Sequence, residues 1–321
     1  MESQGTQRGR WREIGRMLWR ADAPLTATAL LMIPVLAAAA VGLLADDRLV
    51  TGAQAWLKPA KFAASIAIYT LTLAWILAYL PEWRRVRAFA GRTTAATLLL
   101  EMAIIVVQAW RGTSSHFNIS TPLDAVLWST MGTAIAVQTA ASVVVAVAVW
   151  RQRFTDRAMG WALRLGLTIA IAGASSGGLM TRPTQDQWTE ARASGRMRIA
   201  GAHSVGGHDG GRGLPGTRWS MEHGDLRVPH FLGLHALQAL PLMALAIRRR
   251  ASAAIRERLV IVASASYALL FAILLWQALR GQSLASPDAD TVGALVLWIA
   301  GTVVAALAAA RWRPVQIPAA C

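Results

Sequence analysis

Residues 24–45 read PLTATALLMIPVLAAAAVGLLA, and no charged residue interrupts the run. It is longer than the roughly 18 apolar residues that mark a membrane-spanning helix. Arg8, Arg12 and Arg20 precede it, as basic residues precede a secretory signal. The apolar core of such a signal has only about 7–15 residues, so we expect a retained spanning helix. This stretch therefore predicts the fold class, an integral membrane protein.

The composition agrees with a membrane protein. Hydrophobic residues make up 55% of the 321-residue chain and charged residues only 15%, whereas soluble proteins are about 25% charged. We therefore predict an all-α polytopic membrane protein in contact with the lipid bilayer. Its eight expected spans are 24–45, 62–80, 93–111, 126–150, 161–181, 230–247, 259–279 and 291–310.

The formal net charge of +15 raises the question of a nucleic-acid partner. We reject that partner because the arginines lie between the apolar runs, where they signal topology. The basic segments expected on the inner side are those that contain Arg84, Arg151, Arg248 and Arg311. This distribution of arginines predicts that both termini lie in the cytoplasm. The long polar loop 182–229 is then outside, although it carries seven arginines. The single cysteine, Cys321, excludes an intrachain disulfide and a Cys-based metal site.

The chain contains a candidate internal repeat. Gln108-Ala-Trp-Arg-Gly112 ends the third span, and Gln277-Ala-Leu-Arg-Gly281 ends the seventh. Each is followed by a short loop with Pro and Asp, and then by a span that contains Leu-Trp near its start. We predict two four-helix repeats in the same orientation, with a site between them. The expected segments are a cytoplasmic basic segment 1–23, a first half 24–160, a second half 161–310 and a cytoplasmic tail 311–321.

At the level of architecture the chain resembles the haem A synthase family, which has eight spanning helices in two four-helix halves. Gln108/Gly112 and Gln277/Gly281 look like the family's turns, and His235 looks like the histidine of its sixth helix. Trp128 and Trp298 lie near the positions at which the family carries histidines in its fourth and eighth helices. Lys61 stands in place of the histidine of the second helix, and the family's cysteine pair in the outer loop is absent. The resemblance implies the helical layout, and no reaction is carried over from it.

All six histidines fall on the expected outer side, and several lie in the stretch from Trp219 to Pro241. Histidine is the commonest metal ligand, although the chain has no H-E-x-x-H spacing. The alternative is that each histidine is an ordinary hydrogen-bonding group. We name as candidate metal ligands His116, His223, Asp225, His230 and His235, and leave the cofactor open between a metal ion and haem.

Polar residues within the spans are the other candidates, because they are costly in lipid unless paired or functional. Glu101 is the only acid well inside a span, and we assign it with Lys61 and Arg111 to catalysis. The alternative is a structural ion pair of Glu101 with Lys61 or Arg111. Lys61, Ser65, Tyr69 and Thr72 form a polar stripe on one helix face, whose alternative role is hydrogen bonding between helices. The candidate cofactor-binding residues are His235, Gln238, Tyr69 and Gln108.

Residues 201–216 read GAHSVGGHDGGRGLPG, and their glycines exclude a regular helix. This loop either folds over the outer mouth of the bundle or is a flexible linker. The functional hypothesis is a membrane enzyme that binds a metal or haem in an outward-facing His/Glu/Lys/Arg pocket. The first alternative is a transporter or receptor that holds a small polar or anionic ligand there without chemistry. The second is an assembly subunit whose outer loop docks a partner.

Overall fold

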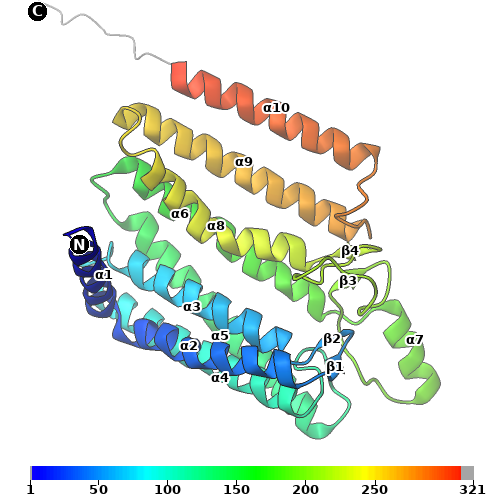
Figure 1. The fold of residues 1–321 in the computed structure, drawn as a ribbon. Helices are drawn as coiled ribbons and strands as arrows, with labels where there is room; N and C mark the ends of the chain where they lie inside the picture. Colours follow the sequence, from blue (N-terminus) through cyan, green and yellow to red (C-terminus); the bar gives the residue numbers. More distant parts are fainter. Residues whose placement is uncertain (1, 312–321) are drawn as a thin grey trace, which may run out of the picture.

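The computed structural model describes the backbone of residues 2–311 and the side chains of residues 12–311. Eight helices in this part of the chain are long and apolar enough to cross a membrane, and the only strands are two short two-stranded ribbons. The prediction of an all-α integral membrane protein with several spans is therefore confirmed (Figure 1). Most of the expected tail, residues 312–321, lies outside the described residues.

The spanning helices run side by side along a common direction (Figure 1). Their bounds are α2 Ala23–Ala45, α3 Leu57–Leu77, α4 Arg84–Trp110, α5 Pro122–Arg151, α6 Arg157–Ser176, α8 Arg227–Ala246, α9 Ala253–Leu279 and α10 Ala289–Arg311.

Several helices begin earlier than the apolar runs indicate. The helix α4 begins at Arg84, where the sequence predicted a span from residue 93, and α3 begins at Leu57, where it predicted residue 62. A hydropathy run marks only the part of a helix that lies in hydrocarbon, whereas the backbone hydrogen bonds continue through the polar boundary. At its other end, α6 stops at Ser176 and passes into a 3₁₀ helix, η1 Gly177–Thr181.

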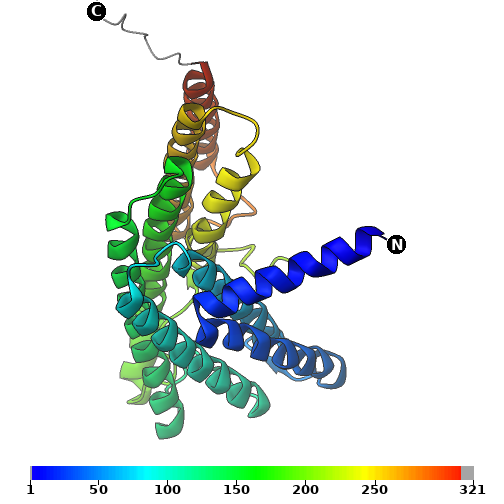
Figure 2. The same cartoon turned by 90° about the vertical axis from the view of Figure 1, so that its left-hand side faces the viewer.

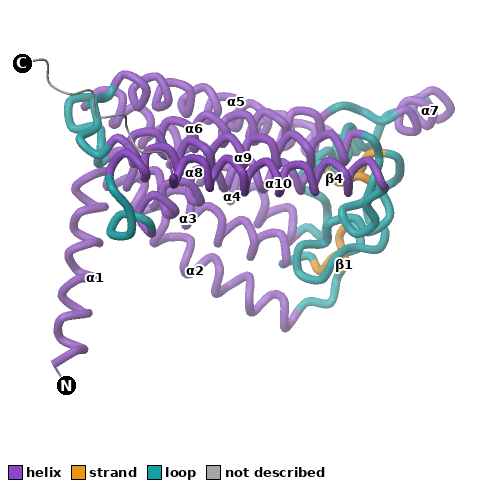
Figure 3. Tube along the Cα trace, turned by 90° about the horizontal axis from the view of Figure 1, so that it is seen from above, coloured by secondary structure: helices purple, strands orange, loops and turns teal. Residues whose placement is uncertain are grey.

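Two helices were not predicted. The helix α1, Glu2–Ala21, covers most of the expected basic segment and leaves the bundle across the direction of the other helices (Figures 2 and 3). The helix α7, Gln185–Ser194, projects from the long loop. A capping box starts α7, in which Thr184 accepts from the backbone of Gln187, and Gly195 ends it in the left-handed conformation. Both are polar helices, so no apolar run marked them.

The helices pack in two groups along the chain. In the first group α2 packs on α3 and α4, and α4 packs on α5; in the second α6 packs on α8 and α9, and α9 packs on α10. The helices α5 and α6 join the groups. The helices α6 and α8 cross at close range, where a Cβ added to Gly173 would lie 2.6 Å from Gly233. Small residues of this kind let membrane helices approach closely.

The bundle has two different ends. We call the end that carries residues 46–56, 111–121, 177–226 and 280–288 the loop end, and the end that carries α1 the terminal end. At the loop end, residues 177–226 fold over both groups of helices: Arg218 donates to Gly52 O, and Ser283 Oγ donates to Ser220 O at 3.1 Å. Two antiparallel ribbons stiffen this end, β1 Leu49–Val50 with β2 Ala53–Gln54, and β3 Ser204–Val205 with β4 Gly224–Asp225. This arrangement corresponds to the first of the two alternatives for the glycine-rich segment.

The helices α4 and α9 end in the same local way. Gln108 Nε2 donates to Ser114 O at 3.4 Å, and Gln277 Nε2 donates to Ser283 O at 2.9 Å. Gly112 and Gly281 then adopt positive φ angles of 70° and 73°. Glycine suits this C-terminal position because other residues are strained there.

Asp124, in the first turn of α5, holds the end of α4. Its buried carboxylate accepts from Gln108 Nε2 at 2.9 Å, from Arg111 Nη1 at 2.7 Å and from Thr121 Oγ1 at 2.6 Å. These three donors, and Ser120 Oγ at 3.4 Å, would lose this acceptor if the carboxylate were removed.

We therefore expect Asp124→Ala to lower the free energy of unfolding by about 3 kcal/mol, because bonds to a buried charge are lost. The measurement is thermal unfolding of the protein in detergent. Asp290→Ala is the matched control, because the side chain of Asp290 is 77% exposed at 3.6 Å from Arg280, and exposed pairs contribute about 0.5 kcal/mol. Equal losses for the two variants would contradict this account.

Candidate functional site

Three ionisable side chains meet beneath the folded loop, and we call them the buried triad: Lys58, Glu101 and His116. Lys58 Nζ lies 2.9 Å from His116 Nδ1, and His116 Nε2 lies 4.0 Å from Glu101 Oε1. Lys58 is at the start of α3, Glu101 is on α4, and His116 is in the loop that follows α4. The Glu101 side chain is only 7% exposed, and His116 is the one basic side chain within 4.0 Å of its carboxylate in the described chain.

The backbone at Phe117 turns His116 into the bundle. Phe117 has a φ of 64° and is 5% exposed. A bulky residue is rare in this left-handed region, which costs about 1–3 kcal/mol. Its carbonyl accepts from Ala200 N at 2.8 Å, so the long loop holds it in place. The His116 ring is packed by Phe62 and Trp128, with ring centroids 5.9 and 5.4 Å away.

Burial lowers the pKa of His116 well below its usual value, and the charges of Lys58, His203 and His230 lower it further. His116 is therefore neutral near pH 7. An ammonium group can only donate hydrogen bonds, so Lys58 donates to Nδ1. The proton of the neutral ring is then on Nε2, the nitrogen that faces Glu101.

Two other histidines lie close enough to affect His116 electrostatically. The His203 ring packs on Phe117 at 4.9 Å, and its Nδ1 is 2.8 Å from Asp209 Oδ2. His230 Nδ1 donates to Gly173 O at 2.7 Å. The three imidazoles therefore gather under the loop, and each already has a polar partner.

The structure does not bring the five predicted metal ligands together. Asp225 is engaged by Arg227 at 2.6 Å and by Ser220 N at 2.7 Å. His235 packs on Phe231 at 4.2 Å between ring centroids, and the His223 ring lies against Gly207. Among the described side chains of residues 12–311, no group of three or more His, Cys, Asp or Glu residues is arranged to hold a metal ion.

The predicted catalytic residues are also separated. Arg111 pairs with Asp124 rather than with Glu101, and Lys61 donates to Thr217 O at 3.1 Å. The alternative considered for Glu101, an ion pair with Lys61 or Arg111, is not formed in the described chain, where the loop after α4 instead folds His116 back onto Glu101.

The predicted cofactor-binding residues make contacts between helices. Gln108 holds Asp124, and Tyr69 Oη accepts from Gln138 Nε2 at 2.9 Å. Gln238 Nε2 donates to Thr72 Oγ1 at 3.3 Å and so links α8 to α3. The Gln238 Oε1 atom is buried without a hydrogen-bond partner in the described chain.

Sequence reasoning missed Lys58 and gave His203 too little weight. Lys58 precedes the polar stripe of α3 by one turn, and this spacing was the available signal. His203 lies in a glycine-rich segment that carries no periodicity, so only the folded loop relates it to His116.

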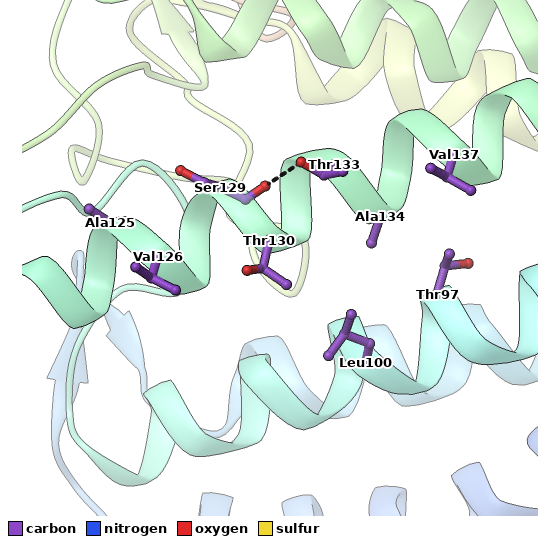
Figure 4. A pocket seen from close by; sticks show the side chains of 9 residues that line it. All are labelled: Thr97, Leu100, Ala125, Val126, Ser129, Thr130, Thr133, Ala134 and Val137. Atoms are coloured by element: carbon purple, nitrogen blue, oxygen red, sulfur yellow. Dashed lines mark hydrogen bonds between the residues drawn. The ribbon is translucent and has the colours of Figure 1, made fainter.

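A groove of 620 Å³ lies elsewhere, between α4 and α5 (Figure 4). Its walls include Thr97 and Leu100 on one helix and Thr130 and Val137 on the other, and they contain no charged residue. None of the predicted site residues lines it. The buried triad is therefore the candidate functional site.

The eight spanning helices make this chain an integral, multi-pass membrane protein. A scan against protein-family models, a search of curated proteins and a search of solved structures each found no match. The resemblance to haem A synthase thus has no support from a family model, and only the eight-helix membrane architecture remains of it.

The His203–Asp209 pair makes the folded loop sensitive to pH. Burial lowers the pKa of His203, against the opposing effect of Asp209. Burial tends to raise the pKa of Asp209, but the hydrogen bond and charge of His203 and the backbone amides of His203 and Ser204 outweigh it and lower that pKa. Both groups therefore bind protons more weakly when the loop is folded.

We expect the loop to lose stability as the pH falls below about 6.5, where the unfolded imidazole takes up a proton. Each unit by which the pKa of His203 is lowered changes the opening equilibrium by about tenfold. Hydrogen exchange of residues 199–209, corrected for intrinsic rates, should show less protection at low pH, while residues 49–54 serve as the control segment. Unchanged protection of 199–209 through this range would refute the assignment.

Proposed function

We propose that this membrane protein binds a small anionic ligand at its loop end and exchanges a proton with it through His116. The observation that carries the proposal is the 2.9 Å contact of Lys58 Nζ with His116 Nδ1, with Glu101 4.0 Å from the other ring nitrogen. An imidazole between a cation and a carboxylate can pass a proton by using both of its nitrogens.

The charges around Lys58 favour an anion over a metal cation. Lys61 and Arg227 both interact electrostatically with Lys58. Arg227 is neutralised by Asp225, whereas no acid within 4 Å pairs with Lys58 or Lys61 in the described chain. Two ammonium groups at the start of α3 are thus available to a carboxylate or phosphate.

The proton exchange balances within the triad. His116 Nε2–H gives its proton to the Glu101 carboxylate, and Nδ1 takes a proton from the Lys58 ammonium. Lys58 is left as a neutral amine, which takes the proton of the bound acid and becomes the cation that pairs with the resulting anion. Closure of the loop over the triad excludes water and strengthens these interactions.

The metal- or haem-binding enzyme remains the alternative from the sequence. It rests on the five predicted ligands His116, His223, Asp225, His230 and His235, of which no three are grouped to hold a metal ion in the described residues. Optical spectra and elemental analysis of the purified protein separate the two hypotheses. A haem band or one bound metal per chain would favour the alternative.

We also infer that the two four-helix groups are repeats. The inference is supported by the matching ends of α4 and α9, where a glutamine, an arginine–aspartate pair and a left-handed glycine recur. The buried triad belongs to the first group, and its loop cover comes from the second, so the site depends on both.

The ligand test uses acetate, succinate and inorganic phosphate as probes of thermal stability in detergent. We expect at least one to stabilise the protein, and Lys58→Met or His116→Gln to weaken its binding by at least about tenfold, through the loss of a charge-assisted bond. Glu101→Gln should remove the proton uptake or release that accompanies binding.

Arg153→Gln, an exposed change at the terminal end, is the matched control and should bind as the wild type does. Binding that is unchanged in Lys58→Met would reject the site. The absence of stabilisation by every probe would reject the anionic ligand class.

The loop end is proposed to face outward, because the arginines of residues 84–92, 151–157 and 248–258 lie at the terminal end. In a Cys321→Ser background, Ala193→Cys should react with an impermeant maleimide on intact cells, and Thr155→Cys should react only after lysis. Both positions are exposed, so accessibility is matched. The reverse labelling pattern would invert the topology.

A further inference from the structure

A second charged hollow lies at the terminal end, far along the helices from the buried triad. We call it the corner pocket, a space of 440 Å³ where α1, α2 and α4 meet. Its charged and aromatic lining residues are Trp19, Arg20, Asp22, Arg84, Arg87 and Arg92.

The four arginines form no ion pair with the acids whose side chains the structure describes. Among the side chains of residues 12–311 none of them has an acid within 4 Å, and Arg87 Nε is buried without a hydrogen-bond partner. Arg87 Nη2 donates to Ala21 O at 2.5 Å, which fixes the guanidinium at the pocket. Arg87 is only partly buried and lines the pocket, so its guanidinium group adds to the positive charge there.

Asp22 is the single acid that lines the corner pocket, and its side chain caps a helix. Asp22 is 8% exposed and caps α2, where it accepts from Leu25 N at 3.0 Å. Gly91 allows α4 to pack directly on it, since a Cβ there would lie 1.9 Å from Asp22 Oδ2. Burial raises the pKa of Asp22, and the Leu25 amide and the charges of Arg87 and Arg92 oppose this rise. The pocket lining thus sets this one carboxylate against four arginines.

The position of the corner pocket matches the depth of lipid headgroups. It lies at the first residues of the spanning helix α2, and α1 leaves the bundle there across the direction of the spans (Figure 2). Trp19 is 50% exposed beside it, and tryptophan is typical of the boundary between the bilayer and water. Basic pockets at this depth suit phosphate headgroups.

We propose that the corner pocket binds the phosphate headgroup of an anionic membrane lipid. The phosphate oxygens accept from the guanidinium groups of Arg84, Arg87 and Arg92, and the acyl chains follow the lipid-facing side of α2. The lipid thereby joins α1 to the bundle. This inference is independent of the ligand proposed for the loop end.

The test is a lipid titration of the full chain in detergent, with bound lipid counted by native mass spectrometry. The probes are phosphatidylglycerol, phosphatidylcholine and inorganic phosphate. We expect phosphatidylglycerol to bind most tightly, and Arg84→Gln/Arg92→Gln to weaken it roughly 30-fold, from the loss of two charges near the headgroup.

Arg85→Gln is the matched control, because Arg85 is an exposed arginine of the same helix that does not line the corner pocket. It should change the affinity by less than about threefold. Equal binding of the two lipids, or an Arg85→Gln effect as large as that of the double variant, would overturn the proposal. Binding of inorganic phosphate as tight as that of phosphatidylglycerol would show a soluble-phosphate site and overturn the lipid assignment.

Discussion

The structure depends on the requirement that polar groups in lipid find partners within the protein. The backbone meets this requirement by forming eight spanning helices. The buried side chains meet it by pairing: Asp124 accepts from Gln108, Arg111 and Thr121 at the end of α4, and Glu101 faces His116. Glu101 also interacts electrostatically with Lys58 on α3, and the loop after α4 brings His116 to 4.0 Å from it. The site forms where this loop folds back into the bundle.

The long loop between α6 and α8 completes that arrangement. It contacts residue 52 on one side of the bundle and residue 283 on the other, and its backbone holds Phe117 in a strained conformation. This backbone conformation directs His116 inward, toward Lys58. The glycine-rich segment thus covers the loop end of the bundle, because glycines can adopt the sharp turns that bring His203 onto Phe117.

Each end of the bundle combines paired charges with cations that have no ion-pair partner among the described side chains. Arg227 pairs with Asp225 at the loop end, and Arg256 pairs with Asp156 at the terminal end. The unpaired cations are Lys58 and Lys61 at the loop end and the arginines of the corner pocket at the terminal end. These unpaired cations are the groups to which the two proposals assign anionic ligands.

The sequence by itself determined the membrane class and the eight spans, because hydropathy and length follow directly from the need to satisfy the backbone in lipid. It also marked Glu101 and His116 as residues to explain. It could not determine that they meet, nor that Lys58 and His203 join them, because these contacts depend on where two irregular loops fold. The tertiary structure alone separated His235 and His223 from the triad and placed Arg111 on Asp124. Side-chain convergence between distant segments leaves no local periodicity, so no pattern in the chain could reveal it.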